Sequence, residues 1–170
     1  MSKAKALSKM TTVGEVLEAA AEFDREAHSF YTDLIPRISK NIRYLVEDLA
    51  RDELRHIRML SKLAKNPEVA AHMQDEIKRP QADRKFTDAA HAPELGDNPD
   101  DQEVLLYALA REQIAIEEYS ELAENTEPGL LHDTFQFLAN EERKHKADLE
   151  ALYYEIVHTA AAPLRHNRQH

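Results

Sequence analysis

Four long segments of this sequence place apolar residues at alternating steps of three and four, which is the spacing of a helix that buries one face in a bundle. They span residues ~13–38, 42–65, 101–125 and 130–158. Glycine, which weakens helices, occurs only 3 times in 170 residues. The pattern predicts an all-α fold, a four-helix bundle built as a single domain over residues 1–158.

The breaks between the segments predict how the helices are connected. Asn66-Pro67 ends the second segment, and Glu127-Pro128-Gly129 separates the third from the fourth. Residues 66–100 form a connection long enough to cross the bundle, so the third helix is expected to run parallel to the second. Part of it, residues 68–78, is predicted as a further short helix. Residues 159–170 have no core pattern and predict a frayed tail.

The composition excludes several classes of site and partner. The sequence has no cysteine, which rules out disulfides, thiolate zinc sites and iron–sulfur clusters. A transition metal must therefore be held by histidine, aspartate and glutamate. The formal net charge of -10 argues against nucleic acid as a partner. No apolar run is long enough for a signal peptide or a membrane span, so the expected location is the cytoplasm.

The chain also contains an internal repeat. The stretch Asp24–Tyr31 aligns with Glu112–Tyr119, so that an acid, an alanine and a tyrosine coincide. The stretch Leu49–His56 aligns with Leu138–His145, where a leucine, an alanine, two acids and a histidine coincide. The bundle is therefore expected to consist of two similar helical hairpins joined by the long connection.

An acid followed three residues later by a histidine occurs four times, and one such pair alone is weak evidence for a metal site. Two of the pairs lie within apolar stripes, at matching positions of the repeat. The other two fall in the connection and on the outer side of the last helix. In this order, the pairs are Glu53/His56, Glu142/His145, Asp88/His91 and Glu155/His158.

Within each predicted hairpin, an acid of the first helix lies level with the acid–histidine pair of the second. Asp24 and Glu53 are equidistant from Ile38–Ser39, where the first turn is expected. Glu112 and Glu142 are equidistant from the Glu-Pro-Gly turn. Six ionisable side chains are thus predicted at one buried level: Asp24, Glu53, His56, Glu112, Glu142 and His145.

Such a cluster is costly to bury without partners. Two divalent cations would balance four carboxylates, and the oxygens and nitrogens would become ligands. This ligand set suits iron or manganese better than tetrahedral zinc. The alternative is that these residues are surface acids on ordinary helices.

The pattern resembles the rubrerythrin branch of the ferritin-like superfamily over about residues 13–158. In that family a glutamate on each of two helices joins Glu-x-x-His on the other two around a di-iron centre. The resemblance implies a ferritin-like bundle with two irons, and it suggests a homodimer. It implies bridging roles for Glu53 and Glu142, terminal carboxylates at Asp24 and Glu112, and terminal imidazoles at His56 and His145.

Three features depart from that family. Asp24 stands where rubrerythrins usually have Glu, which would make the two irons inequivalent. Ala115 occupies the position of an extra Glu one turn after the ligand of the third helix, so the residue on which the iron shift of that family depends is missing here. A cysteine-rich rubredoxin-like tail is absent, so electrons would have to come from another protein.

Four further residues are candidates for contacts around the ligands. Asp52 and Glu141 each precede a bridging glutamate and are placed to accept the second N–H of the opposite histidine. The alternative is that both are solvent-facing helix acids. Tyr31 and Tyr119 lie two turns from the terminal acids and are candidates to hydrogen-bond the bridging carboxylates. Alternatively, they are core aromatics.

The leading functional prediction is a di-iron oxidoreductase that reduces hydrogen peroxide or dioxygen with electrons from an external donor protein. Peroxide reduction is what the resemblance implies, and ferroxidase activity on incoming iron is the nearest variant. The main rival is a non-catalytic protein that binds or sequesters iron. A structural bundle that holds whichever metal is available is a third possibility.

Overall fold

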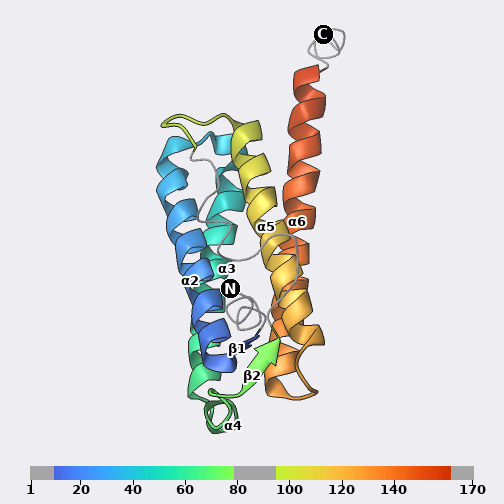
Figure 1. Ribbon diagram of the computed structural model, residues 1–170. Helices are drawn as coiled ribbons and strands as arrows, with labels where there is room; N and C mark the ends of the chain where they lie inside the picture. The colour runs from blue at the N-terminus through green and yellow to red at the C-terminus, as the bar shows by residue number, and fades with distance from the viewer. Residues whose placement is uncertain (1–9, 79–94, 162–170) are drawn as a thin grey trace, which may run out of the picture.

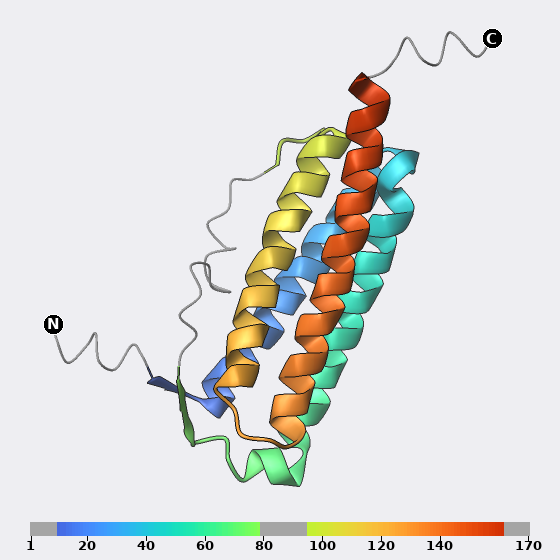
Figure 2. The ribbon, with the colours of Figure 1, turned by 90° about the vertical axis from the view of Figure 1, so that its right-hand side faces the viewer.

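Four long helices form the body of the protein in the computed structural model, which describes residues 10–78 and 95–161. They are α2 (Val13–Leu34), α3 (Lys40–Lys65), α5 (Asp101–Glu124) and α6 (Leu130–Ala161). The helices run side by side, with α2 antiparallel to α3 and α5 antiparallel to α6 (Figure 1). Helices α3 and α5 run in the same direction (Figure 2), as the long connection predicts. The predicted all-α four-helix bundle is confirmed.

Polar side chains fix where three of these helices begin. Thr12 accepts the backbone N–H of Glu15 at the start of α2, at 3.1 Å. Ser39 caps α3 in the same way, and Asp100 accepts a backbone N–H of α5 at 2.8 Å. Each cap satisfies a donor that the helix itself leaves unpaired, and is typically worth about 1 kcal/mol. The caps therefore help to fix the register of the helices.

Two predicted helix ends differ from the structure. Helix α2 ends at Leu34 rather than near residue 38, and a 3₁₀ turn, η1 (Ile35–Arg37), follows it. Pro36 has no backbone N–H with which to continue the α-helical ladder. Helix α6 continues to Ala161, so the predicted fraying is wrong for residues 159–161. Residues 162–170 of the predicted tail lie outside the described residues.

The short helix predicted over residues 68–78 is present only at the start of that stretch. The structure has the four-residue helix α4 (Pro67–Ala70) and then the strand β2 (Glu76–Lys78). Strand β2 pairs antiparallel with β1 (Met10–Thr12), which directly precedes α2. The backbone N–H of Val13 also donates to the carbonyl of Asp75 at 2.9 Å. This ribbon ties the start of α2 to the start of the connection.

The apolar core is divided into two parts along the bundle. One part contains Phe23, Leu60 and Leu138 and extends to Ile77 of β2. The other contains Leu49 and Leu105 and extends to Leu34 and Ile42, on either side of the turn between α2 and α3. On each long helix, the predicted ligands fall between the residues of the two parts. Among the described helices, none is long and apolar enough to cross a membrane.

Candidate metal centre

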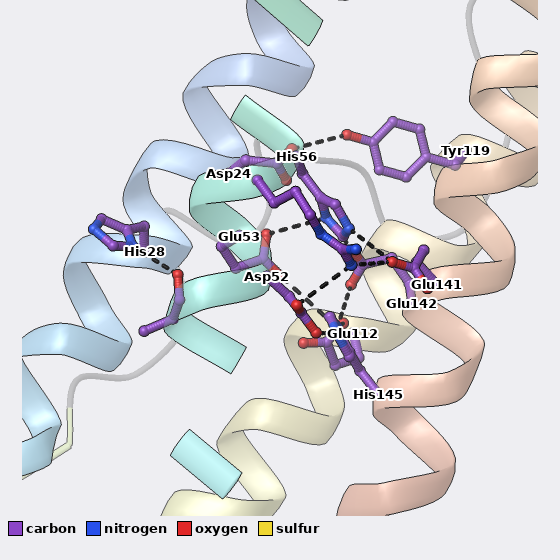
Figure 3. A network of polar contacts seen from close by, with 12 residues as sticks. Asp24, His28, Asp52, Glu53, His56, Glu112, Tyr119, Glu141, Glu142 and His145 are labelled. Carbon is purple, nitrogen blue, oxygen red and sulfur yellow. Dashed lines mark hydrogen bonds and ion pairs between the residues drawn. The ribbon is translucent and has the colours of Figure 1, made fainter. Parts of the chain in front are cut away.

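The layer between the two parts of the core is filled by ionisable side chains. Helices α2 and α5 contribute one each, and α3 and α6 contribute two each (Figure 3). All are buried, and the most exposed of them retains only 5% of its accessible surface. The structure thus brings together the six residues predicted as ligands: Asp24, Glu53, His56, Glu112, Glu142 and His145.

Glu142 and Glu53 each extend two oxygens toward different histidines. Glu142 places Oε1 3.1 Å from Nδ1 of His56 and Oε2 3.5 Å from Nδ1 of His145. Glu53 places Oε2 3.9 Å from Nδ1 of His56 and Oε1 4.0 Å from Nδ1 of His145. These two carboxylates therefore lie between two positions, each of which has its own imidazole. This is the arrangement that bridging ligands require.

The remaining two carboxylates lie one at each position. Glu112 has Oε2 3.7 Å from Nδ1 of His145, and ligand atoms of Asp24, Glu53 and His56 lie within 4.8 Å of one another. At the other position, ligand atoms of four residues lie within 4.8 Å of one another: Glu53, Glu112, Glu142 and His145. The two positions are therefore similar in layout but unequal in ligand number.

The outer carboxylates, those of Asp24 and Glu112, each accept a hydrogen bond from a tyrosine of the other hairpin. Tyr31 on α2 donates its hydroxyl to Oε1 of Glu112 on α5 at 3.2 Å. Tyr119 on α5 donates to Oδ2 of Asp24 on α2 at 3.3 Å. The sequence pattern predicts tyrosine contacts with Glu53 and Glu142, so this assignment is corrected. The phenols orient the outer carboxylates across the α2–α5 interface.

Each of the six side chains has a buried atom that lacks a hydrogen-bond partner. For Asp24 and Glu112, it is the oxygen not engaged by tyrosine. For both histidines it is Nδ1, the nitrogen nearest the carboxylates, and His56 leaves Nε2 without a partner as well. The seven atoms are Asp24 Oδ1, Glu53 Oε2, His56 Nδ1, His56 Nε2, Glu112 Oε2, Glu142 Oε1 and His145 Nδ1. Buried polar atoms are rarely left unpaired, so this set of hard oxygen and imidazole donors fits a pair of metal ions.

When no metal is bound, burial is the main cause of a raised pKa in three of the carboxyl groups. It raises the pKa of Asp24 to about 7, with a further contribution from the charge of Glu142. Burial and the same charge raise the pKa of Glu53 and of Glu112 well above the usual range. These groups therefore hold protons at pH values where exposed carboxyls are ionised.

The histidines and Glu142 instead favour their charged forms, because each lies beside groups of opposite charge. Burial alone would lower the pKa of His145, but Glu112 and Glu142 outweigh it and raise that pKa to about 12. The pKa of His56 is also raised, since Glu142 outweighs its burial. Burial alone would raise the pKa of Glu142, but Glu112 and the two imidazoles outweigh it and lower that pKa. Without metal, protons on these groups therefore supply part of the positive charge that metal cations would supply.

On the outer side of the imidazoles, acids and an arginine form a network across α3 and α6. Nε2 of His145 donates to Oδ2 of Asp52 at 2.8 Å. Glu141 lies 3.7 Å from Nε2 of His56, which is too long for a hydrogen bond. Arg55 donates to Glu141 and lies 3.3 Å from Asp52. Asp52 therefore orients His145, whereas the main partner of Glu141 is Arg55.

The other acid–histidine pairs do not join the cluster within the described residues. Glu155 and His158 are exposed on α6, and Asp88/His91 lies outside the described residues. Arg55 was missed by sequence reasoning, as was the buried Arg111 next to Glu112. Neither arginine belongs to an apolar stripe or a metal-binding spacing, so the sequence carries no signal for them.

Comparison with known proteins identifies the family. The search of curated proteins and the search of solved structures returned no match. The family model described as Rubrerythrin matches residues 15–153, which include all four long helices except the ends of α2 and α6. This range covers the six clustered side chains and both tyrosines. The all-α bundle is thus a ferritin-like one, and the chain belongs to the rubrerythrin family.

Proposed function

We propose that this protein is a di-iron oxidoreductase that reduces hydrogen peroxide or dioxygen with electrons from an external donor. The observation that carries the proposal is that all six side chains of a buried layer have at least one oxygen or nitrogen atom without a hydrogen-bond partner. Membership of the rubrerythrin family supports iron as the metal. Manganese is the nearest alternative, because it accepts the same carboxylate and imidazole donors.

Charge balance supports two divalent ions rather than one. The four carboxylates would carry four negative charges once their protons are displaced, and two divalent cations neutralise them. Glu53 and Glu142 would hold both ions because each faces both imidazoles. Asp24 and Glu112 would each hold one ion with one oxygen, while the tyrosines fix the other oxygen.

When bound, the iron pair supplies the two electrons that cleave the O–O bond of peroxide. The chain contributes a buried layer between the two parts of the apolar core. Asp52 holds the orientation of His145, and Tyr31 and Tyr119 hold the outer carboxylates. The buried Ala115, one turn after Glu112, offers no carboxylate for exchange during the reaction.

We also propose that the electron donor is a separate protein. Within these 170 residues there is no cysteine, and therefore no cysteine-ligated redox centre to relay electrons to the layer. Asp52 and Glu141 are only partly buried, so the α3–α6 side brings the imidazoles close to solvent. A donor that docks on this side would be near the proposed centre.

The test is anaerobic iron loading followed by rapid mixing with hydrogen peroxide and, separately, with dioxygen. We expect a ferric absorption band to form with at least one oxidant. In the presence of a reductant, an enzyme consumes oxidant repeatedly, whereas an iron-binding protein reacts once and stops. No response to either oxidant, with two irons bound, would contradict the proposal and favour the binding function.

A further inference from the structure

The outer nitrogen of His56, Nε2, is buried and has no hydrogen-bond partner. Among the described residues, Glu141 is the acid that approaches this nitrogen, with Oε1 3.7 Å away. That distance is too long for a hydrogen bond. The corresponding nitrogen of His145 donates to Oδ2 of Asp52 at 2.8 Å (Figure 3). The two histidines of the layer therefore differ in their support on the outer side.

Arg55 occupies the oxygen that His56 would need as its acceptor. Nη2 of Arg55 donates to Oε1 of Glu141, which is the same oxygen that faces Nε2 of His56. Nη2 also lies 3.3 Å from Oδ1 of Asp52, but His145 bonds the other oxygen of that acid, Oδ2. Arg55 therefore competes with one histidine for its acceptor and does not compete with the other.

The internal repeat shows that this competition belongs to one half of the layer. In the repeat, Glu141 corresponds to Asp52, and Arg55 corresponds to Lys144. Lys144 is exposed on α6, and the ion pairs of Asp52 within the described residues are with Arg55 and His145. The cation that takes the acceptor of a histidine thus has no counterpart in the other half.

An acceptor at Nε2 matters for a histidine that holds a metal ion through Nδ1. Such a histidine carries its proton on Nε2, and a carboxylate that accepts this proton orients the ring and strengthens it as a ligand. Loss of the acceptor typically lowers metal affinity by about 10–100-fold. In this protein His145 has that support and His56 lacks it, although an acid lies nearby.

The contact between Arg55 and Glu141 lies at the edge of the layer. The side chain of Arg55 is 54% exposed, and that of Glu141 is 17% exposed. Ion pairs with an exposed partner contribute little to stability, so the bundle does not depend on this one for folding. Replacement of Arg55 can therefore release Glu141 without opening the core.

We propose that Arg55 weakens the metal position that contains His56, because it holds Glu141 away from Nε2 of that histidine. The inference rests on the proposed function, since it takes His56 to hold a metal ion through Nδ1. Arg55 is a positioning residue that acts on His56 through Glu141. It leaves the position of His145 firmly supported and makes the position of His56 the one that exchanges its metal more readily.

The experiment is an anaerobic titration of the metal-free protein with Mn²⁺ in a double-mutant cycle. The cycle comprises the wild type, Arg55→Met, Glu141→Gln and the double variant, and methionine keeps most of the length of arginine without its charge. The matched control is Arg51→Met, since Arg51 is an exposed arginine of the same helix that pairs with Asp48. Nitrogen-15 NMR of the Zn²⁺-loaded proteins, which are diamagnetic, follows the Nε2–H group of each histidine.

We expect Arg55→Met to strengthen the weaker binding step about tenfold, the lower end of the effect of a histidine acceptor. The weaker step is expected at the position of His56, which has fewer ligand atoms within mutual reach. Glu141→Gln should change little in the wild type but should remove the gain in the Arg55→Met background. Arg51→Met should bind Mn²⁺ as the wild type does.

The NMR measurement reports the hydrogen bond itself. In Arg55→Met, the Nε2 proton of His56 should move downfield toward the resonance of its counterpart in His145, because it gains an acceptor. It should return in the double variant. A role for Arg55 in folding alone would leave this resonance where it is in the wild type.

Loss of a positive charge would by itself strengthen both binding steps, with or without Glu141. A similar gain in both steps that persists in the double variant would therefore overturn the proposal, as would unchanged Mn²⁺ binding in Arg55→Met. Failure of the wild type to bind two metal ions would instead overturn the proposed function. Should Arg55→Met fail to fold, Arg55→Gln, which also lacks the charge, takes its place in the cycle.

Discussion

The imidazole rings of His56 and His145 lie nearly parallel, with centroids 6.0 Å apart and planes inclined by 25°. Both turn Nδ1 toward the central carboxylates and Nε2 toward acids on the outer side of the bundle. The internal repeat of the sequence is therefore also a repeat in space. It creates two related candidate metal positions, and the differences between them lead to testable predictions.

Asp24 should make the two positions unequal in metal affinity. Its side chain is one methylene shorter than that of Glu112, and its position has fewer ligand atoms within mutual reach. We expect anaerobic titration of the metal-free protein with Mn²⁺ to show two separate binding steps. In Asp24→Glu the steps should move together, whereas the matched Glu112→Asp should weaken the first step. Two identical steps in the wild type would contradict this inequality.

Asp52 should tune the metal affinity of the position that contains His145. Loss of an acid that orients a histidine ligand typically lowers metal affinity by about 10–100-fold. We expect Asp52→Asn to weaken one of the two binding steps by this amount and to leave the other nearly unchanged. Asp48→Asn is the control, because Asp48 is an exposed acid of the same helix that pairs with Arg51. An equal effect of both substitutions would argue against an orienting role.

The stability of the metal-free protein should fall as the pH rises. Asp24 has a pKa of about 7 in the folded protein and 3.8 in the unfolded chain. Between these values the folded state holds the extra proton, so the free energy of unfolding decreases by about 1.4 kcal/mol per pH unit for this group. His145 acts in the same direction above its unfolded pKa of 6.5, since its folded pKa is about 12.

Urea unfolding at pH 5 and pH 8 measures this effect. The metal-loaded protein should behave in the opposite way, because protons compete with the metals at acid pH. In Asp24→Asn, the decrease between pH 5 and pH 7 should be smaller than in the wild type. Metal-free protein that becomes more stable from pH 5 to pH 8 would show that the buried carboxyls are not protonated.

The level of the cluster within each hairpin could be predicted from the sequence, because helix rise and turn position fix which residues face each other. Asp24 meets Glu53 and His56, for example, because the turn after α2 lies midway between them. The repeat suggests that Asp52 meets the opposite histidine, which it does, but the partners of the tyrosines in the other hairpin could not be predicted in this way. The tyrosines reach across α2 and α5, and the 35-residue connection does not specify which helices become neighbours.

Other features left no recognisable signal in the sequence. Strands β1 and β2 have three residues each, too few to show an alternating pattern. They form because the segment before α2 and the segment after α4 happen to meet at one end of the bundle. Arg111 lies off the apolar stripe, and its burial depends on Phe23 and Phe30 of another helix.

The most direct measurement is the metal content of the iron-loaded protein, compared between the wild type, Glu142→Ala and Glu155→Ala. Glu142 faces both imidazoles, whereas Glu155 belongs to an exposed acid–histidine pair on the same helix. We expect two irons per chain in the wild type and in Glu155→Ala, and a loss of both in Glu142→Ala. Two irons retained in Glu142→Ala, or none bound by the wild type, would contradict a buried dimetal centre.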